Sequence, residues 1–142
     1  MKVEVLGLAG LLATTITSAA PDKVQYELQE RCGKQAAETF KREWKSNVVT
    51  QKDGQFVASY RNHYSAKLNK CFYVEMSNFY PKGKPGSASH ESLRLFDLHE
   101  NKEYGTFYDM RSTDVLMDCR VLEKRCASKA EWESLIKPYM ED

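Results

Sequence analysis

Four cysteines constrain the fold of this chain more than any other sequence feature. They are Cys32, Cys71, Cys119 and Cys126, and in an exported protein an even number of cysteines favours disulfides over free thiols. Four cysteines allow three pairings. We favour Cys119 with Cys126, which would pin a local turn, and Cys32 with Cys71, which would tie a helix to a sheet.

No two of these cysteines have the Cys-x-x-Cys spacing. Zinc ribbons, thioredoxin-like redox pairs and haem attachment sites all use that spacing. The sequence therefore contains no motif for a cofactor or a metal, although a metal-binding domain stays open as an alternative function.

The first 20 residues predict export. One lysine precedes an apolar stretch at residues 5–12, and the segment ends in Ser18, Ala19 and Ala20. That order is typical of a secretory signal peptide, which we expect to be cleaved after Ala20. The apolar stretch is much shorter than the roughly 20 residues needed to cross a bilayer. We therefore predict a signal peptide at residues 1–20 and one secreted or periplasmic domain at residues 21–142, with no integral membrane segment after cleavage.

The charge of the chain favours no strongly charged partner. Its formal net charge is +1, and no block of five or six like charges occurs. Blocks of basic residues are typical of proteins that bind nucleic acid or anionic membranes. We expect no nucleic acid as partner, and instead an unidentified protein or small molecule.

Both ends of the domain predict amphipathic helices. Asp22 can cap a helix over residues 23–45, with Gln25 three residues later. At the other end, Ser128 and Glu131 form a capping box, and we expect a kink or an irregular last turn at Pro138. The apolar residues of the two segments recur at helical spacing: Val24, Leu28, Cys32, Ala36, Phe40 and Trp44 in the first, and Trp132, Leu135, Ile136, Tyr139 and Met140 in the second.

The segment between these helices predicts an antiparallel sheet. Residues 71–76 alternate between apolar and polar or aromatic side chains, as a half-buried strand does. The loop "YPKGKPGSASHE" follows, and then "SLRLFDLH" and "YGTFYDM" form a hairpin. A short extended piece at residues 56–60 precedes these strands, and "CRV" can add another. We predict an α+β domain in which N-terminal and C-terminal helices pack on a three- to four-stranded antiparallel sheet stapled by disulfides.

The stretch "YRNHYSAKLNKCF" at residues 60–72 contains the only histidine with a dense polar and aromatic environment. The periodicity favours a helical turn, which would place His63, Tyr64 and Lys67 on one face. An extended conformation would instead point His63 and Tyr64 to opposite faces. We expect the other two histidines, His90 and His99, to be solvated in a loop and a turn.

A hydrolase is one alternative function. His63 would act as general base, oriented by a carboxylate of the hairpin, and the sequence offers no Gly-x-Ser-x-Gly nucleophile motif beside it. Such carboxylates are more often solvated groups on exposed turns. The available hairpin carboxylates are Asp97, Glu100, Glu103 and Asp109.

A binding surface is the other possibility, because tyrosine offers a flat amphipathic contact to a ligand or partner. Aromatic residues in strands more often fill the core or brace neighbouring strands. The candidate binding residues are Tyr64, Lys67, Tyr73, Tyr104 and Tyr108. We favour a non-enzymatic secreted or periplasmic binding module over the hydrolase, because no complete catalytic motif is present.

The stretch at residues 60–72, together with "LHENKEYGTF", the late cysteine pair and "EWESLIKPYMED", resembles a group of small uncharacterised bacterial secreted proteins. The resemblance covers most of the domain and is densest in the Tyr-x-x-His-Tyr-x-x-Lys-Leu-Asn-Lys-Cys-Phe motif, residues 60–72. It implies export from a bacterial cell and a fold that depends on Cys71. It implies no activity and gives no residue a catalytic or binding role.

Overall fold

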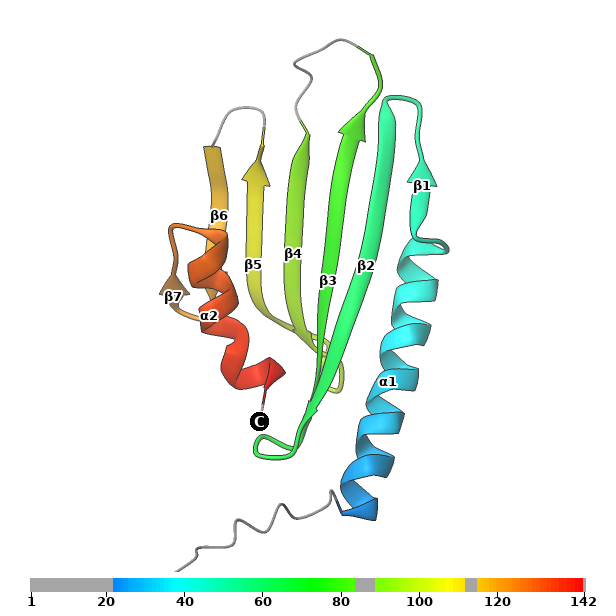
Figure 1. Ribbon diagram of the computed structural model, residues 1–142, viewed down its shortest axis with the longest axis vertical. Coiled ribbons are helices and arrows are strands. Elements are labelled where there is room, and N and C mark those ends of the chain that lie inside the picture. Colours follow the sequence, from blue (N-terminus) through cyan, green and yellow to red (C-terminus); the bar gives the residue numbers. More distant parts are fainter. Residues whose placement is uncertain (1–21, 84–88, 112–114, 142) are drawn as a thin grey trace, which may run out of the picture.

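A computed structural model describes residues 22–83, 89–111 and 115–141. The predicted signal peptide and the middle of the loop at residues 80–91 lie outside the described residues. The described chain forms a seven-stranded antiparallel sheet in which the strands lie in sequence order, with one helix near each end of the chain (Figure 1). The elements are α1 (Lys23–Trp44), β1 (Val48–Thr50), β2 (Gly54–Ser65), β3 (Lys70–Pro81), β4 (His90–Asp97), β5 (Lys102–Met110), β6 (Val115–Val121), β7 (Lys124–Arg125) and α2 (Lys129–Met140).

The α+β class is confirmed, but the predicted sheet of three to four strands is too small. Strand β2 pairs with β3 along its whole length, from Gly54 opposite Pro81 to Ser65 opposite Lys70. Its sequence alternates poorly because polar residues occupy both faces near its end, so periodicity alone indicates only a short extended piece. The outer strands β1 and β7 have three and two residues, which is too short for a pattern to be recognised.

The two helices cover opposite faces of the sheet. Phe72 and Val74 of β3 belong to the core that contains Trp132 and Ile136 of α2. Tyr73, between them, belongs to a second core with residues of α1. Since side chains alternate along a strand, β3 is buried on both faces. Strand β3 is therefore the central element of the molecule.

Helix α1 buries the predicted stripe, with two corrections. Cys32, Ala36 and Phe40 are buried, whereas Val24 at the start of the stripe is exposed. The side chain of Asp22 forms no capping hydrogen bond, and only its backbone carbonyl accepts the Tyr26 N–H (3.0 Å). The first turn of α1 extends beyond the turn between β2 and β3 (Figure 1), and Val24 in that turn of the helix is 58% exposed.

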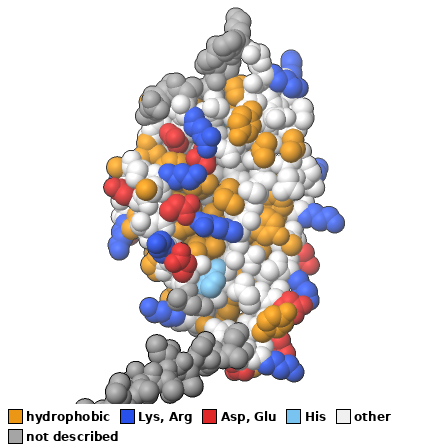
Figure 2. Space-filling model, in the orientation of Figure 1, with side chains coloured by type: hydrophobic (Ala, Val, Ile, Leu, Met, Phe, Trp, Pro, Cys, Tyr) orange, Lys and Arg blue, Asp and Glu red, His pale blue; other side chains and the backbone are white. Residues whose placement is uncertain are grey.

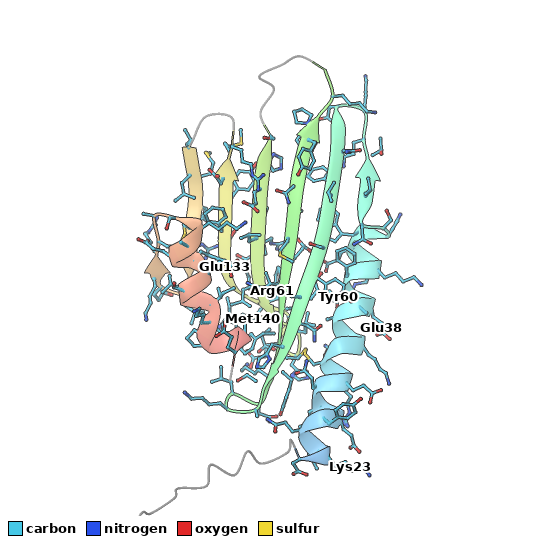
Figure 3. The ribbon with its side chains drawn as sticks, in the orientation of Figure 1. Lys23, Glu38, Tyr60, Arg61, Glu133 and Met140 are labelled. Atoms are coloured by element: carbon cyan, nitrogen blue, oxygen red, sulfur yellow. A yellow bond between two sulfur atoms is a disulfide. The ribbon has the colours of Figure 1, made fainter. Side chains whose placement is uncertain are left out.

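Helix α2 begins at the predicted cap. The Ser128 hydroxyl accepts the Glu131 N–H (3.2 Å), and the Glu131 carboxylate accepts the Ala127 N–H (2.7 Å). The helix continues through Pro138 to Met140. An ion pair of 2.5 Å between Arg61 of β2 and Glu133 attaches α2 to the sheet (Figure 3).

Both favoured disulfides are present. Cys32 of α1 is bonded to Cys71 at the start of β3, and Cys119 of β6 is bonded to Cys126. The first bond is buried and fixes α1 to the central strand. No helix of the described ranges combines the length and the apolar character needed to cross a bilayer.

Candidate ligand site beside helix α1

The α1 side of the sheet is only partly covered, because α1 lies along β2 and β3 and does not extend over β4 to β6 (Figure 1). The side chains of β4 to β6 on this face are half-buried or exposed. At the border of the covered part lies a cavity of about 380 Å³. A recess of about 20 Å³ beside it shares Thr39, Leu98 and Asn101 with that cavity. The cavity is lined by Gln35, Glu38, Thr39, Arg42, Leu98 and Asn101, and the recess adds Glu43, Tyr73 and Phe96. We call the cavity and its recess the α1 groove.

Helical spacing brings the α1 residues of the groove together. Glu38, Thr39 and Arg42 come three, four and seven positions after Gln35, which places the four residues on one face of the helix. The Gln35 amide donates a hydrogen bond to the Leu98 carbonyl (3.1 Å), so α1 is fixed against the turn between β4 and β5.

The floor of the recess comes from the sheet. Tyr73 of β3 and Phe96 of β4 are direct partners in the strand register. Both therefore point to the α1 side at the same level of the sheet.

Tyr73 is the unusual residue of this floor. It is 1% exposed, and its hydroxyl has no hydrogen-bond partner among the described residues. Burial raises the pKa of Tyr73, and the carboxyls of Glu75 and Glu43 raise it further, so the hydroxyl stays protonated. Nearly all buried polar groups in proteins are hydrogen-bonded, and an unpaired one costs about 1–3 kcal/mol.

Two carboxyls lie near this hydroxyl. Glu75 is two residues along β3 on the same face and is 5% exposed. Burial raises the pKa of Glu75; the Trp44 indole opposes the rise, the Glu43 carboxyl adds to it, and the Arg94 guanidinium opposes it. The net direction is upward, so the Glu75 carboxyl binds a proton more readily than a free carboxyl does, even though a cation lies beside it.

Arg94 is that cation. Its Nη1 lies 3.7 Å from Glu75 Oε1, its Nη2 lies 3.2 Å from Glu103, and its guanidinium carbon is 4.5 Å from the centre of the Phe96 ring. The floor therefore already holds one cation between an aromatic ring and carboxylates.

The structure places only one predicted binding residue, Tyr73, in the α1 groove. Tyr64 is buried beside the Cys32–Cys71 disulfide, and its hydroxyl donates to Asn69 (2.7 Å). Tyr104 lies on the opposite face, packed on Phe72. Tyr108 lies on the α1 side, farther along the sheet, where its ring centre is 5.2 Å from that of His90.

The helical turn predicted for residues 60–71 is wrong. Residues up to Ser65 belong to β2, so His63 and Tyr64 point to opposite faces, and Lys67 is exposed in the turn that follows. Lys67 lines a separate cavity of about 290 Å³ between the start of α1 and the end of α2.

His90 is also not the solvated loop residue we expected, since it begins β4 and stacks on Phe79 with ring centres 5.1 Å apart. His99 is exposed in a turn, as expected.

The hairpin carboxylates proposed to orient His63 are mostly held by cations. Lys70 binds Asp97, which is fully buried, and Glu100 (2.7 Å). Glu103 is bound by Arg94 and Arg120, each at 3.2 Å. Asp109 lines a third cavity, of about 230 Å³, beside Lys129. The role of His63 as general base stays a prediction.

Sequence reasoning missed Glu43, Glu75 and Arg94. One signal was available: Glu75 interrupts "CFYVEM", the most apolar strand of the chain, at a position that alternation assigns to the Tyr73 face. Burying a carboxylate at such a position costs free energy unless a neighbouring group pairs with it. Glu43 could not be found, because its proximity to Glu75 depends on how α1 packs.

Charges elsewhere are mixed in sign. Figure 2 shows lysine, arginine and acidic side chains interspersed on the α2 side, with no large area of one charge on the visible face. Within the described ranges, no group of three or more histidine, cysteine or acidic side chains is placed to hold a metal ion.

No protein-family model, no curated protein and no solved structure matches the chain.

Proposed function

We propose that this protein is a non-enzymatic binding module that takes a ligand in the α1 groove. The observation that carries the proposal is the Tyr73 hydroxyl, which is buried and protonated beside a cavity and has no hydrogen-bond partner in the part of the chain that the structure describes. A buried polar group is normally paired, and a ligand in the groove would supply the missing partner.

We further propose that the module is exported from a bacterial cell and works in the periplasm or outside the cell. Three observations support this: the signal-peptide pattern of residues 1–20, the resemblance to small bacterial secreted proteins, and two disulfides, which persist in oxidising compartments.

The test is a screen of small molecules against isotope-labelled protein, followed by backbone amide shifts. We expect a binder to shift amides of residues 35–43 and 96–101 together. Tyr73→Phe should weaken that binder at least fivefold, and Tyr108→Phe, which makes the same change on the same side outside the groove, should not. A binder that shifts only amides elsewhere, or that is indifferent to Tyr73→Phe, would contradict the groove as the site.

A further inference from the structure

Three features of the α1 groove indicate the chemical class of its ligand: the sign of its charge, the nature of its floor and the size of its recess. This inference rests on the proposed function, since it describes what the same site would bind.

The groove has an acidic lining in which one carboxylate, that of Glu38 (labelled on α1 in Figure 3), lacks an ion-pair partner among the described residues. Arg94 is occupied by Glu75 and Glu103. Arg42 approaches Glu43 only to 3.6 Å, and its side chain is 69% exposed. A cationic group entering the groove would therefore meet the carboxylate of Glu38, which no cation of the described residues neutralises.

The floor of the groove suits a cation as well. The Tyr73 ring stacks on Tyr60 with centres 5.5 Å apart, and its centre lies 6.5 Å from that of Phe96. Aromatic faces attract cations, as the position of Arg94 over Phe96 illustrates.

The recess sets the size of the group that can reach Tyr73. A volume of about 20 Å³ holds one water-sized group, since a water needs roughly 10–15 Å³ by this measure. An ammonium group has that size, whereas a planar guanidinium does not fit. The recess also offers oxygen acceptors for the ammonium hydrogens, from Thr39, Glu43, Tyr73 and Asn101.

We propose that the α1 groove binds a primary alkylammonium group, whose charged end enters the recess between Glu43 and Tyr73 while its alkyl chain lies in the larger cavity. Such a group occurs both in free polyamines and in lysine side chains of peptides, and the two sources share this chemistry.

The experiment is a calorimetric and amide-shift titration with four probes. Cadaverine and the peptide Gly-Lys-Gly carry an ammonium, agmatine adds a guanidinium, and 1-pentanol is a neutral control. We expect cadaverine or Gly-Lys-Gly to bind with shifts in the groove, and pentanol not to bind. Tighter binding by cadaverine indicates a free amine ligand, and tighter binding by the peptide indicates a lysine side chain. Agmatine should bind through its ammonium end only, no more tightly than cadaverine.

Two variants complete the test. Glu43→Gln should weaken ammonium binding at least tenfold, and binding to the unchanged protein should weaken as salt rises. Glu30→Gln removes the same charge from the same helix at an exposed site outside the groove, and should change binding less than twofold. Groove binding by neutral or anionic molecules from the screen, without any response to the amines, would overturn this inference and leave the binding module intact. No groove response to any molecule would overturn both.

Discussion

Tyr73 on β3 and Tyr64 on β2 both face the α1 side of the sheet, yet their hydroxyls differ in hydrogen bonding. The Tyr64 hydroxyl donates to Asn69 (2.7 Å), and the Tyr73 hydroxyl has no partner among the described residues. We expect Tyr64→Phe to lower the free energy of unfolding by about 1 kcal/mol, and Tyr73→Phe to leave it unchanged or raise it by up to about 1 kcal/mol. Urea denaturation measures both. A loss for Tyr73→Phe as large as that for Tyr64→Phe would mean that the hydroxyl is already paired in the free protein.

Two buried glutamates on adjacent strands have pKa values shifted in opposite directions. For Glu91, burial opposes ionisation, but hydrogen bonds from Lys129 (2.7 Å) and Arg111 (3.0 Å) lower the pKa overall. For Glu75, burial and the Glu43 carboxyl raise it. Ionisation of Glu91 therefore adds to the stability of the folded state, and ionisation of Glu75 subtracts from it.

The sign of each shift predicts a pH dependence. The contribution of Glu91 is present above the unfolded value of 4.5 and is lost as the pH falls through its lowered folded pKa. That of Glu75 is present below 4.5 and is lost as the pH rises through its raised folded pKa. At pH 7 we expect Glu91→Gln to be less stable than the unchanged protein and Glu75→Gln to be more stable, with both differences shrinking toward pH 4. Urea denaturation at the two pH values decides this, and equal signs would contradict the assignment.

Among the elements, α1 and β3 depend most on a covalent link. The Cys32–Cys71 disulfide closes a separation of 39 residues, and Cys119–Cys126 closes one of 7. The chain-entropy relation gives about 4 kcal/mol for the long loop and about 2.4 kcal/mol for the short one.

We therefore expect replacement of both Cys32 and Cys71 by serine to lower the unfolding free energy more than the matched replacement of Cys119 and Cys126. Changing both partners avoids a reactive unpaired thiol. Cys71→Ser alone should be at least as damaging as the double change, because it leaves Cys32 unpaired in the core. Chemical denaturation compares the three variants, and an equal or smaller loss for the Cys32 and Cys71 pair would refute the ranking.

The elements also differ in how well sequence predicts them. Helix α2 was predictable because its cap and its apolar spacing agree. Strand β2 was not, because Arg61, Asn62 and His63 interrupt the alternation, and the strand is held by pairing with β3 and by the helices on both sides. Where pairing with another strand holds residues in an extended conformation, their own sequence need not show the pattern of a strand.

At the scale of the whole molecule, the class, the end helices and the presence of two disulfides were predictable, because each rests on patterns within one segment or on the cysteine count; the favoured pairing is confirmed, but the count alone allows three. The α1 groove was not, apart from Tyr73. It requires the β3–β4 register, which sets Phe96 beside Tyr73, and the position of α1, which brings Glu43 to Glu75. Both the register and the helix position relate segments that are distant in sequence, and the pattern of a single sequence does not show them.

The strand order also determines the order in which the sheet can form during folding. Every strand pairs with its neighbour in sequence, so the sheet can grow one strand at a time with little loop-closure cost. Helix α2 comes last, yet it covers Phe72 and Val74 in the middle of the sheet. Until α2 docks, one face of the central strand stays open to solvent. A chain cut before α2 would therefore expose Phe72 and Val74, although the core beneath α1 would keep its own helix.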